Sequence, residues 1–222
     1  MAVYIGTNRI RVPWDGMIAY YPLTSETTVN DMSVNWNTLT NTNSVTFWTY
    51  QWVDSASFSW GSSGSYLVIG KSLWTWNSKF TVSQWFYKTS AASSDATFWA
   101  IWDGNNANTI YTYVEWWLLV VALNTTEYLP SMPSCPLNSW NLLTITHDGS
   151  TVKCYLNWSL VSSKSKTLSI ANLRTCIGKS VNLSSTRPRT WYLSECIFEN
   201  YAWDSSDIAI YYNQTKGKYW IS

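Results

Sequence analysis

Short runs of alternating apolar and polar residues recur along the chain, and clusters of turn-forming residues separate them. A period of two places successive side chains on opposite faces, which predicts β-strands, and closely spaced short strands predict an all-β sandwich or barrel. The predicted strands span residues 17–23, 45–48, 56–58, 66–69, 80–88, 97–102, 109–115, 118–123, 140–147, 151–156, 167–170, 175–178 and 192–200.

The two ends of the chain differ from this pattern. Residues 205–213 favour a helix, with Asp204 or Ser205 as the N-cap and Asp207 in the first turn, where a carboxylate suits the helix dipole. Residues 1–14 contain one short extended run and two arginines. We therefore predict a leader or docking segment over 1–14 and a single domain over 15–222.

The longest predicted strands do not divide into an apolar and a polar face. Along residues 142–147 one face carries Leu143, Ile145 and His147, and the other carries Leu142, Thr144 and Thr146. Both faces include apolar side chains, which is typical of strands covered on both sides. We expect a second sheet on one face and loops folded over the other.

Composition and charge narrow the classes of partner. Charged residues make up 12% of the 222 residues, and the formal net charge is +1. No polybasic stretch is present, so we expect no nucleic-acid partner. The longest apolar run, 116–123, is too short to span a bilayer. No signal peptide is visible at the start, so we expect a virion or extracellular protein made without one, or a fragment of a longer chain.

The four cysteines, Cys135, Cys154, Cys176 and Cys196, are widely spaced and form no C-x-x-C pair. This spacing gives a zinc site little support. Three of them fall within predicted strands, where a thiol packs as a small apolar side chain. The pattern favours free core thiols over disulfides.

Tryptophan is in excess: the chain has 17 tryptophans and 9 glycines, whereas average composition gives about 16 glycines. Asn157 and Trp158 lie between two strand-like runs, at the place of a two-residue hairpin turn. Asn-Gly is the usual pair in such turns because both residues need positive φ, which a bulky side chain disfavours. We therefore ask whether the indole rings form a binding surface or replace glycines.

Four stretches resemble concanavalin A-like, laminin G-like lectin domains, in the order in which that family carries them. They are residues 16–23 (GMIAYYPL), 80–85 (FTVSQW), 140–149 (WNLLTITHDG) with 155–157 (YLN), and 192–212, which include Trp203 and the run from Asp207 to Tyr212. The resemblance covers about residues 15–215. It implies a jelly-roll sandwich of two antiparallel sheets and a non-catalytic binding module.

The chain departs from the family pattern mainly at glycines. Trp158, Trp191 and the Trp36 of the turn 31–37 stand where the family has glycine, and so do Trp52, Trp60 and Trp76. Trp85, Trp140 and Trp203, by contrast, stand where the family itself has tryptophan. We hypothesise that the gene reads UGA as glycine, so that its conceptual translation places tryptophan at the first group. Under this hypothesis most of the anomalous rings are absent from the natural protein.

The candidate ligand-binding residues are oxygen donors in one loop and tyrosines on strands. Asp103, Asn105 and Asn106 offer two or three oxygens, and relatives in the resembled family hold calcium at one rim of the sandwich. A hairpin loop without metal is the alternative interpretation, so the expected cofactor is none, or calcium bound by Asp103 and Asn105. Tyr87, Tyr111 and Tyr113 are the aromatic candidates, and the alternative for each is packing within its sheet.

Catalysis has little support in the sequence. Retaining glycosidases need two carboxylates about 5–5.5 Å apart, whereas Glu195 and Glu199 would lie roughly 13 Å apart on one strand. The only histidine, His147, ends a predicted strand, and we interpret it as structural. We expect no enzyme.

The favoured function is a binding module for glycans or another cell-surface ligand. The alternative is a structural or adhesive virion component, such as a phage tail or receptor-binding protein, and a glycoside hydrolase relative is less favoured. The leader could mediate homo-oligomers or contacts with virion partners.

Overall fold

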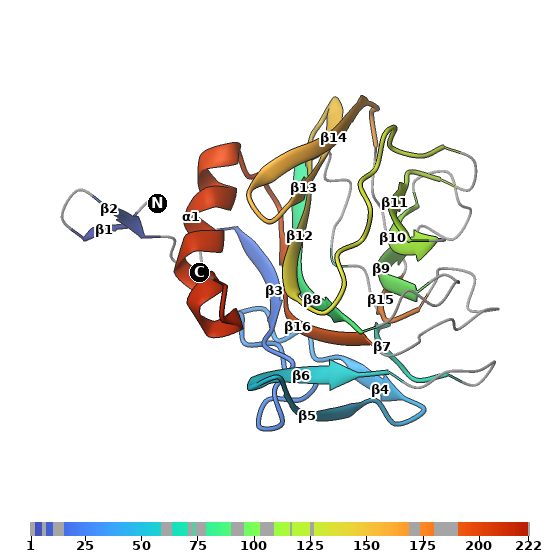
Figure 1. The fold of residues 1–222 in the computed structure, drawn as a ribbon, viewed down its shortest axis with the longest axis vertical. Coiled ribbons are helices and arrows are strands. Elements are labelled where there is room, and N and C mark those ends of the chain that lie inside the picture. The colour runs from blue at the N-terminus through green and yellow to red at the C-terminus, as the bar shows by residue number, and fades with distance from the viewer. Residues whose placement is uncertain are drawn as a thin grey trace.

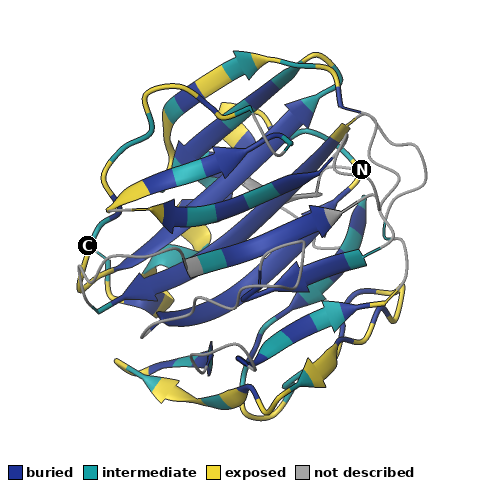
Figure 2. Ribbon diagram, turned by 90° about the vertical axis from the view of Figure 1, so that its right-hand side faces the viewer, coloured by how far each residue is buried: buried dark blue, intermediate teal, exposed yellow. Residues whose placement is uncertain are grey.

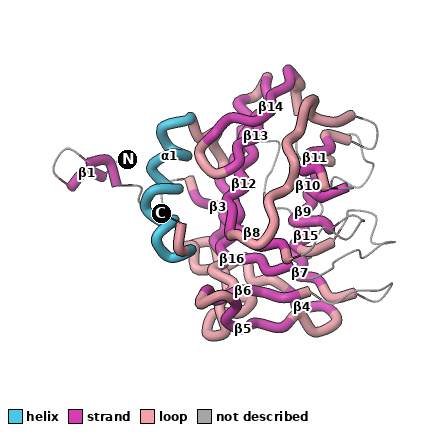
Figure 3. Tube along the Cα trace, viewed as in Figure 1, coloured by secondary structure: helices cyan, strands magenta, loops and turns pink. Residues whose placement is uncertain are grey.

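The computed structural model describes residues 3–5, 8–10, 16–58, 64–70, 73, 79–89, 96–102, 109–115, 117–124, 127–168, 174–179 and 191–221. Within these ranges two antiparallel sheets face each other, and a helical segment lies outside them (Figure 1). Strands dominate the described chain, with helix only near the C-terminus (Figure 3). The predicted jelly-roll sandwich with one short C-terminal helix is confirmed.

The larger sheet has eight strands and contains the longest ones. They are β3 (Met17–Tyr21), β5 (Thr46–Tyr50), β6 (Val53–Ser57), β8 (Lys79–Lys88), β12 (Trp140–Asp148), β13 (Thr151–Leu156), β14 (Ser159–Ser165) and β16 (Trp191–Glu199). Five of them follow one another in the order β14-β13-β12-β8-β16. On the other side of β16, β6 pairs with its beginning (residues 192–193) and β3 with its end (residues 196–199). β5 pairs with β6. Residues from both ends of the domain therefore meet in the middle of this sheet.

The smaller sheet has six strands in the order β11-β10-β9-β15-β7-β4. They are β4 (Thr40–Thr42), β7 (Tyr66–Ile69), β9 (Ala96–Trp102), β10 (Ile110–Glu115), β11 (Leu118–Ala122) and β15 (Arg174–Ile177). Viewed from outside this sheet, the buried residues occupy the middle of the molecule and the exposed ones gather at its borders (Figure 2). In the predicted leader, β1 (Val3–Ile5) and β2 (Asn8–Ile10) pair with each other.

The main core fills the space between the sheets. Leu143 and Ile145 of β12 point into it, as the period of two predicts, and both are buried. Aromatic rings from the two sheets meet there, with Phe86 of β8 4.7 Å from Phe98 of β9, centroid to centroid. Burial of side chains of this size stabilises the fold by about 1.5–3 kcal/mol each.

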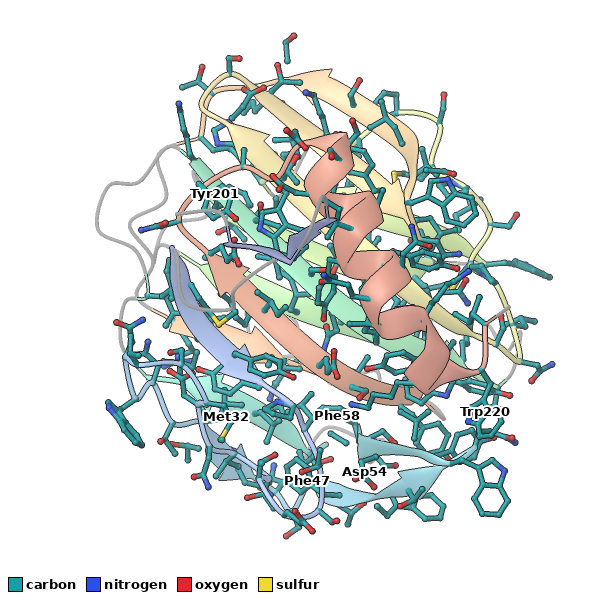
Figure 4. All side chains as sticks on the ribbon, turned by 90° about the vertical axis from the view of Figure 1, so that its left-hand side faces the viewer. Met32, Phe47, Asp54, Phe58, Tyr201 and Trp220 are labelled. Atoms are coloured by element: carbon teal, nitrogen blue, oxygen red, sulfur yellow. The ribbon has the colours of Figure 1, made fainter. Side chains whose placement is uncertain are left out.

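Helix α1 (Ser205–Thr215) and the 3-10 helix η1 (Lys216–Tyr219) cover the outer face of the larger sheet (Figure 4). Asp204 is the N-cap: its side chain accepts from the Asp207 backbone N–H, and the Asp207 carboxylate accepts from the Asp204 N–H. This capping box satisfies two N–H groups that the first helical turn leaves without partners. The predicted helix and its cap are confirmed, and the helix continues two residues further than predicted.

A second apolar core lies between this helical layer and the sheet. Trp85 of β8 stacks on Tyr219 at 3.9 Å and an interplanar angle of 16°, and Trp203 and Ile208 are buried beside it. We predicted loops over this face, and that was wrong: a helix covers it. The apolar residues on both faces of β8 and β12 indicated a cover but not its secondary structure.

The sequence missed strands that have little apolar content. β4 was not predicted, and β14 was indicated only by Leu160 and Val161 after the turn, because Ser, Thr, Asn and Lys fill most of their positions. The predicted strand 167–170 is wrong at residues 167–168, which have no strand structure, and its other two residues lie outside the described ranges. Pairing with a neighbour, which a local pattern does not report, decides these segments.

The four predicted glycine-like positions that the structure describes fall into two groups. Trp36 and Trp52 have positive φ, 52° and 64°, as expected. In the hairpin between β13 and β14, Asn157 has a φ of 59° but Trp158 does not have positive φ, so the prediction for Trp158 is wrong. A type II′ turn needs positive φ only at its first central residue, which explains this geometry. Trp191 also lacks positive φ and is buried in the main core.

The turn 31–37 is fixed by one buried carboxylate. The two oxygens of Asp31 accept hydrogen bonds from the backbone N–H groups of Tyr20, Ser33 and Asn37, at 2.7–2.9 Å, and from the Ser33 hydroxyl. Asn37 in turn donates to the carbonyl of Ile18 on β3. This motif of the sequence is therefore structural, since it attaches the turn to the edge of the larger sheet.

All four cysteines are free and buried, as predicted. Cys154, Cys176 and Cys196 lie in strands β13, β15 and β16. Burial raises the pKa of Cys135 to about 12 and that of Cys176 to about 11. These thiols stay protonated near neutral pH and are poor nucleophiles.

Candidate functional site

A cleft of about 250 Å³ opens where the helical layer ends, over the outer face of the larger sheet. We call it the C-terminal cleft. Its lining residues are Gln51, Trp52, Tyr87, Asn138, Ser139, Trp140, Tyr219, Trp220 and Ile221. Figure 4 looks at this face and shows Trp220 beside the β5–β6 hairpin. Segments far apart in the sequence thus build one concave surface, the usual form of a ligand site.

Three turns of the chain form the walls. Gln51 and Trp52 are the two-residue loop between β5 and β6, with φ of 48° and 64°. Asn138 has a φ of 54° and donates its backbone N–H to the carbonyl of Lys88 at 2.7 Å, which holds this turn at the end of β8. Trp220 follows η1 with a φ of 56°, and its N–H points back to the carbonyl of Gly217.

Aromatic rings form the floor. Tyr87 and Trp140 are directly opposite across β8 and β12, with ring centroids 5.6 Å apart, and Tyr219 lies 5.2 Å from Trp140. Next to them Tyr50 stacks on Tyr192 at 3.6 Å with an interplanar angle of 11°, and Tyr50 lies 5.1 Å from Tyr87. The rings make a continuous surface across the end of the sheet.

None of the described lining residues carries a charged side chain. Gln51, Asn138 and Ser139 are exposed and offer amide and hydroxyl groups to a ligand. Burial raises the pKa of the Tyr87 phenol, with a further contribution from Tyr50, and burial likewise raises the pKa of Tyr219. Both phenols are therefore neutral at physiological pH.

The indole N–H of Trp140 is buried, and no described residue accepts its hydrogen bond. Buried donors without a partner are uncommon, because losing water without compensation costs free energy. Trp140 also lines the cleft. Trp85 and Trp99 carry buried indole N–H groups in the same state, so this feature is not special to the cleft. Flat rings and exposed amides suit a ligand that has apolar faces and many hydroxyl groups.

A second pocket, of about 210 Å³, lies between β3, β16 and α1, but its carboxylate is already engaged. Glu195 accepts from the Lys218 ammonium group at 2.7 Å and from the Tyr211 hydroxyl at 2.9 Å. Glu195 is the extra residue of a bulge in β16 and has a φ of 38°. We interpret this network as an attachment of the helical layer to the sheet.

Glu199 has a parallel role, because the indole N–H of Trp203 donates to its carboxylate. Each of the two acidic residues considered for catalysis thus has its own partner: Tyr211 of α1 for Glu195, and Trp203, just before α1, for Glu199. His147 is buried, and its Nε2 lies 2.9 Å from the carbonyl of Lys166, as expected of a structural histidine. In the described part of the chain, no three His, Cys, Asp or Glu side chains gather so as to hold a metal ion.

Among the predicted site residues that the structure describes, Tyr87 lies apart from Tyr111 and Tyr113. Tyr87 lines the C-terminal cleft, whereas Tyr111 and Tyr113 lie half-buried on the outer face of the smaller sheet, stacked at 5.5 Å. Asp103, Asn105 and Asn106, including the calcium-loop residues, lie outside the described residues. The calcium loop therefore stays a prediction.

Sequence reasoning missed Gln51, Asn138, Ser139 and Tyr219. Their local patterns are those of ordinary turns and of a chain end, and no motif singles them out. Trp140 was noticed only as a family tryptophan. Among the described helices, none is both long and apolar enough to cross a membrane.

Comparison with known proteins adds three structures of similar fold. Botulinum neurotoxin type C, studied for its dependence on two ganglioside molecules in cell entry, has a TM-score of 0.68 and 16% identity, over 90% of this chain and 51% of that one. The binding domain of botulinum neurotoxin DC in complex with SialylT has a TM-score of 0.70 and 15% identity, over 90% and 52%. The chain spans about half the length of these toxin structures.

Domain 4 of AbnA, a GH43 extracellular arabinanase from Geobacillus stearothermophilus in complex with arabinotriose, has a TM-score of 0.68 and 14% identity, over 87% of this chain and 96% of that one. None of the curated proteins matches the chain in sequence. A family model described as the concanavalin A-like lectin/glucanases superfamily matches residues 61–209. Because this match covers more than half of the chain, the protein belongs to the concanavalin A-like lectin/glucanases superfamily.

Proposed function

We propose that the protein is a non-catalytic module that binds glycans in the C-terminal cleft. The observation that carries the proposal is the combination of an aromatic floor and exposed amide side chains in one cleft. Apolar sugar faces stack on aromatic rings, and sugar hydroxyls bond with amides and indoles. Two of the structures of similar fold were solved with saccharide ligands, arabinotriose and SialylT, which supports the proposal.

The charge of the lining favours neutral saccharides over acidic ones. A carboxylate or sulfate buried in this cleft would find no cation among the described lining residues, and burying an unpaired charge is costly. We therefore expect neutral oligosaccharides to bind more tightly than sialylated ones.

A glycan array followed by calorimetry tests the proposal. Asn138→Gly keeps the positive φ of this turn and removes the amide, and Trp140→Phe keeps a ring but reduces the aromatic surface of the floor. We expect Asn138→Gly to bind the best neutral glycan about tenfold more weakly, as for one lost hydrogen bond in a desolvated site. We expect Trp140→Phe to weaken binding as well, because a smaller ring offers less stacking surface. Thermal unfolding in parallel identifies any variant that fails to fold.

Tyr111→Phe is the matched control, because Tyr111 was also predicted to bind ligand but lies on the other sheet. Loss of binding in Tyr111→Phe, with normal binding in Asn138→Gly and Trp140→Phe, would contradict the assignment to the cleft. Each measurement is made with calcium and with a chelator, which tests the predicted calcium loop at the same time. Release of reducing sugar from a bound oligosaccharide would contradict a non-catalytic role.

The adhesive virion role is a second prediction that uses the same surface, because a tail or receptor-binding protein also binds its host through a surface ligand. Tail or capsid genes beside this gene would support it, and secretion genes beside it would contradict it. The predicted docking role of the leader is tested by deleting residues 1–14 and measuring assembly.

A further inference from the structure

Three hairpins of the fold carry tryptophan at the second position of a two-residue loop. Tyr50 pairs with Val53, Glu115 with Leu118, and Leu156 with Ser159, so each loop contains two residues. The second residues of these loops are Trp52, Trp117 and Trp158. Two-residue hairpin loops favour Asn-Gly, Asp-Gly and Gly-Gly because their backbone twist needs positive φ.

Four tryptophans have a backbone conformation that L-residues with bulky side chains rarely adopt. The φ angles are 52° at Trp36, 64° at Trp52, 121° at Trp117 and 56° at Trp220. Contact between Cβ and the backbone makes this region unfavourable, and glycine alone avoids that contact. All four rings are also largely exposed, at 79%, 84%, 51% and 76%. Little packing of the ring therefore offsets the strain.

The buried tryptophans form a second class. Trp85, Trp99 and Trp203 are fully buried, and neither they nor Trp140 and Trp191 are among the described residues with positive φ. Their side chains pack in the two cores, which explains why tryptophan stands at these positions. Exposure alone does not define the first class, because Trp48 and Trp158 are exposed without positive φ. The backbone angle is what sets the four tryptophans apart.

Strain at a functional site is the alternative explanation, since binding residues sometimes hold unfavourable backbone angles. Trp52 and Trp220 both line the C-terminal cleft, so this explanation could apply to them. Trp36 and Trp117 do not line it. A binding role therefore does not account for all four positions.

We propose that the natural protein carries glycine at positions 36, 52, 117 and 220. A gene that reads UGA as glycine would produce this substitution. The structure selects these four from the backbone angle, independently of any family pattern, and two of them, Trp117 and Trp220, were not singled out by that pattern. Trp158 and Trp191 lack positive φ, so glycine at these two positions rests on the family pattern alone.

One consequence rests on the proposed function. With glycine at 52 and 220 the cleft loses its two exposed rim rings and opens directly onto Tyr87, Trp140 and Tyr219. The ligand-binding groups of the natural protein are then the floor of the cleft and its amides, not the exposed indoles.

Stability measurements test the backbone argument. Gly, Asn and Ala are introduced in turn at 36, 52 and 117, and thermal unfolding is followed. We expect each glycine to raise the midpoint by about 2–4 °C, asparagine to raise it less, and alanine to change it least, because alanine keeps the Cβ contact. Equal effects of glycine and alanine would overturn the argument, because removal of the ring alone would then explain the change.

Trp48→Gly is the matched control, since Trp48 is also exposed but lies within β5 without positive φ. We expect it to lower the midpoint, because glycine weakens a strand interior. An increase at this position as large as at Trp52 would also overturn the argument.

The codons and glycan binding complete the test. UGG codons at positions 36, 52, 117 and 220 would overturn the proposal, and UGA codons there together with glycine in peptides of the natural protein would establish it. For the best neutral glycan, the dissociation constant of the double variant W52G/W220G is expected to lie within about threefold of that of the protein with tryptophan at both positions, a change of under 1 kcal/mol in binding free energy. Loss of glycan binding in this double variant alone would overturn the consequence for the cleft. Absence of glycan binding in every variant would contradict the proposed function, but it would not affect the order of stabilities expected for glycine, asparagine and alanine.

Discussion

The outer faces of the two sheets differ, although strands of similar composition build both. On the larger sheet a helical layer covers Trp85 and Leu142 and forms a second core, and a cleft opens where this layer ends. On the smaller sheet Tyr111 and Tyr113 stack on each other and stay half-buried. Aromatic side chains on a strand therefore form a concave site only where a second layer covers part of the sheet and then stops.

The difference also explains the position of the acidic residues. Glu195 and Glu199 lie on the covered face, and each accepts a hydrogen bond from the layer above it. A carboxylate under a second layer needs such partners, because burying it without them is costly. These residues therefore attach the layers to each other.

The largest expected effect separates the two faces directly. Trp85→Ala should lower the free energy of unfolding by about 3–5 kcal/mol, because it removes a fully buried ring from between the sheet and η1. Tyr113→Ala, on the other outer face, should cost about 1 kcal/mol. Denaturant unfolding measures both, and equal losses would refute the claim that the helical layer gives the larger sheet a second core.

The edge of the larger sheet gives a second contrast. Asp31→Ala should cost about 3 kcal/mol, since it leaves four hydrogen-bond donors in a buried turn without their acceptor. Asp54→Ala is the control at the exposed edge, where Asp54 accepts from Thr49 in an exposed contact, and should cost under about 1 kcal/mol. A cost at Asp54 equal to that at Asp31 would contradict the structural role of the turn.

A smaller effect tests the attachment of the helical layer. Tyr211→Phe removes a hydrogen bond to the buried carboxylate of Glu195 and should cost about 2 kcal/mol. Tyr219→Phe removes a hydrogen bond between two hydroxyl groups and should cost about 1 kcal/mol. If the order of the two losses is reversed, Glu195 does not anchor the helix.

The smallest effects are electrostatic. Hydrogen bonds from Ser150 lower the pKa of Asp148, and the Lys166 ammonium group lowers the pKa of Glu127. A carboxyl group whose folded pKa is lowered adds stability above its unfolded pKa, near pH 4, and loses it as the pH falls through the folded value. The stability of Asp148→Asn and Glu127→Gln should therefore approach that of the parent protein as the pH is lowered from 7 to 3.

Salt distinguishes these two carboxylates. Screening weakens the exposed ion pairs of Glu127 but has little effect on the short hydrogen bonds within the turn of Asp148. At 1 M salt the difference between Glu127→Gln and the parent should disappear, while that of Asp148→Asn persists. Persistence of both differences would indicate that Glu127 also acts through local hydrogen bonds.

Several local features followed from the sequence because neighbouring residues determine them. The strands β7 and β13 begin and end as predicted, since alternating runs between turns specify them. The cap of α1 followed from Asp204 and Asp207, which are three residues apart and bond to each other's backbone. The family pattern of four ordered motifs gave the jelly roll.

The candidate site did not follow from the sequence. Of the residues in the C-terminal cleft, only Tyr87 was predicted to bind ligand, and it was grouped with tyrosines of the other sheet. Gln51, Asn138 and Tyr219 have no local signal, because each serves its own turn or chain end in an ordinary way. Positive φ was predicted correctly at Trp36 and Trp52, because neighbouring residues determine the conformation of a turn. It was predicted wrongly at Trp158, because a two-residue loop can also form a turn that needs positive φ only at its first residue.

By itself, therefore, the sequence determined most of the strands, the helix cap, the free thiols, the type of sandwich and part of the set of misplaced tryptophans. These depend on contacts within a few residues or on a period that one strand carries alone. Only the tertiary structure decided what covers the larger sheet and where the cleft opens. The order of the strands around β16 brings residues 51, 87, 138 and 219 to one end of the sheet, and long-range pairing, which no local pattern encodes, fixes that order.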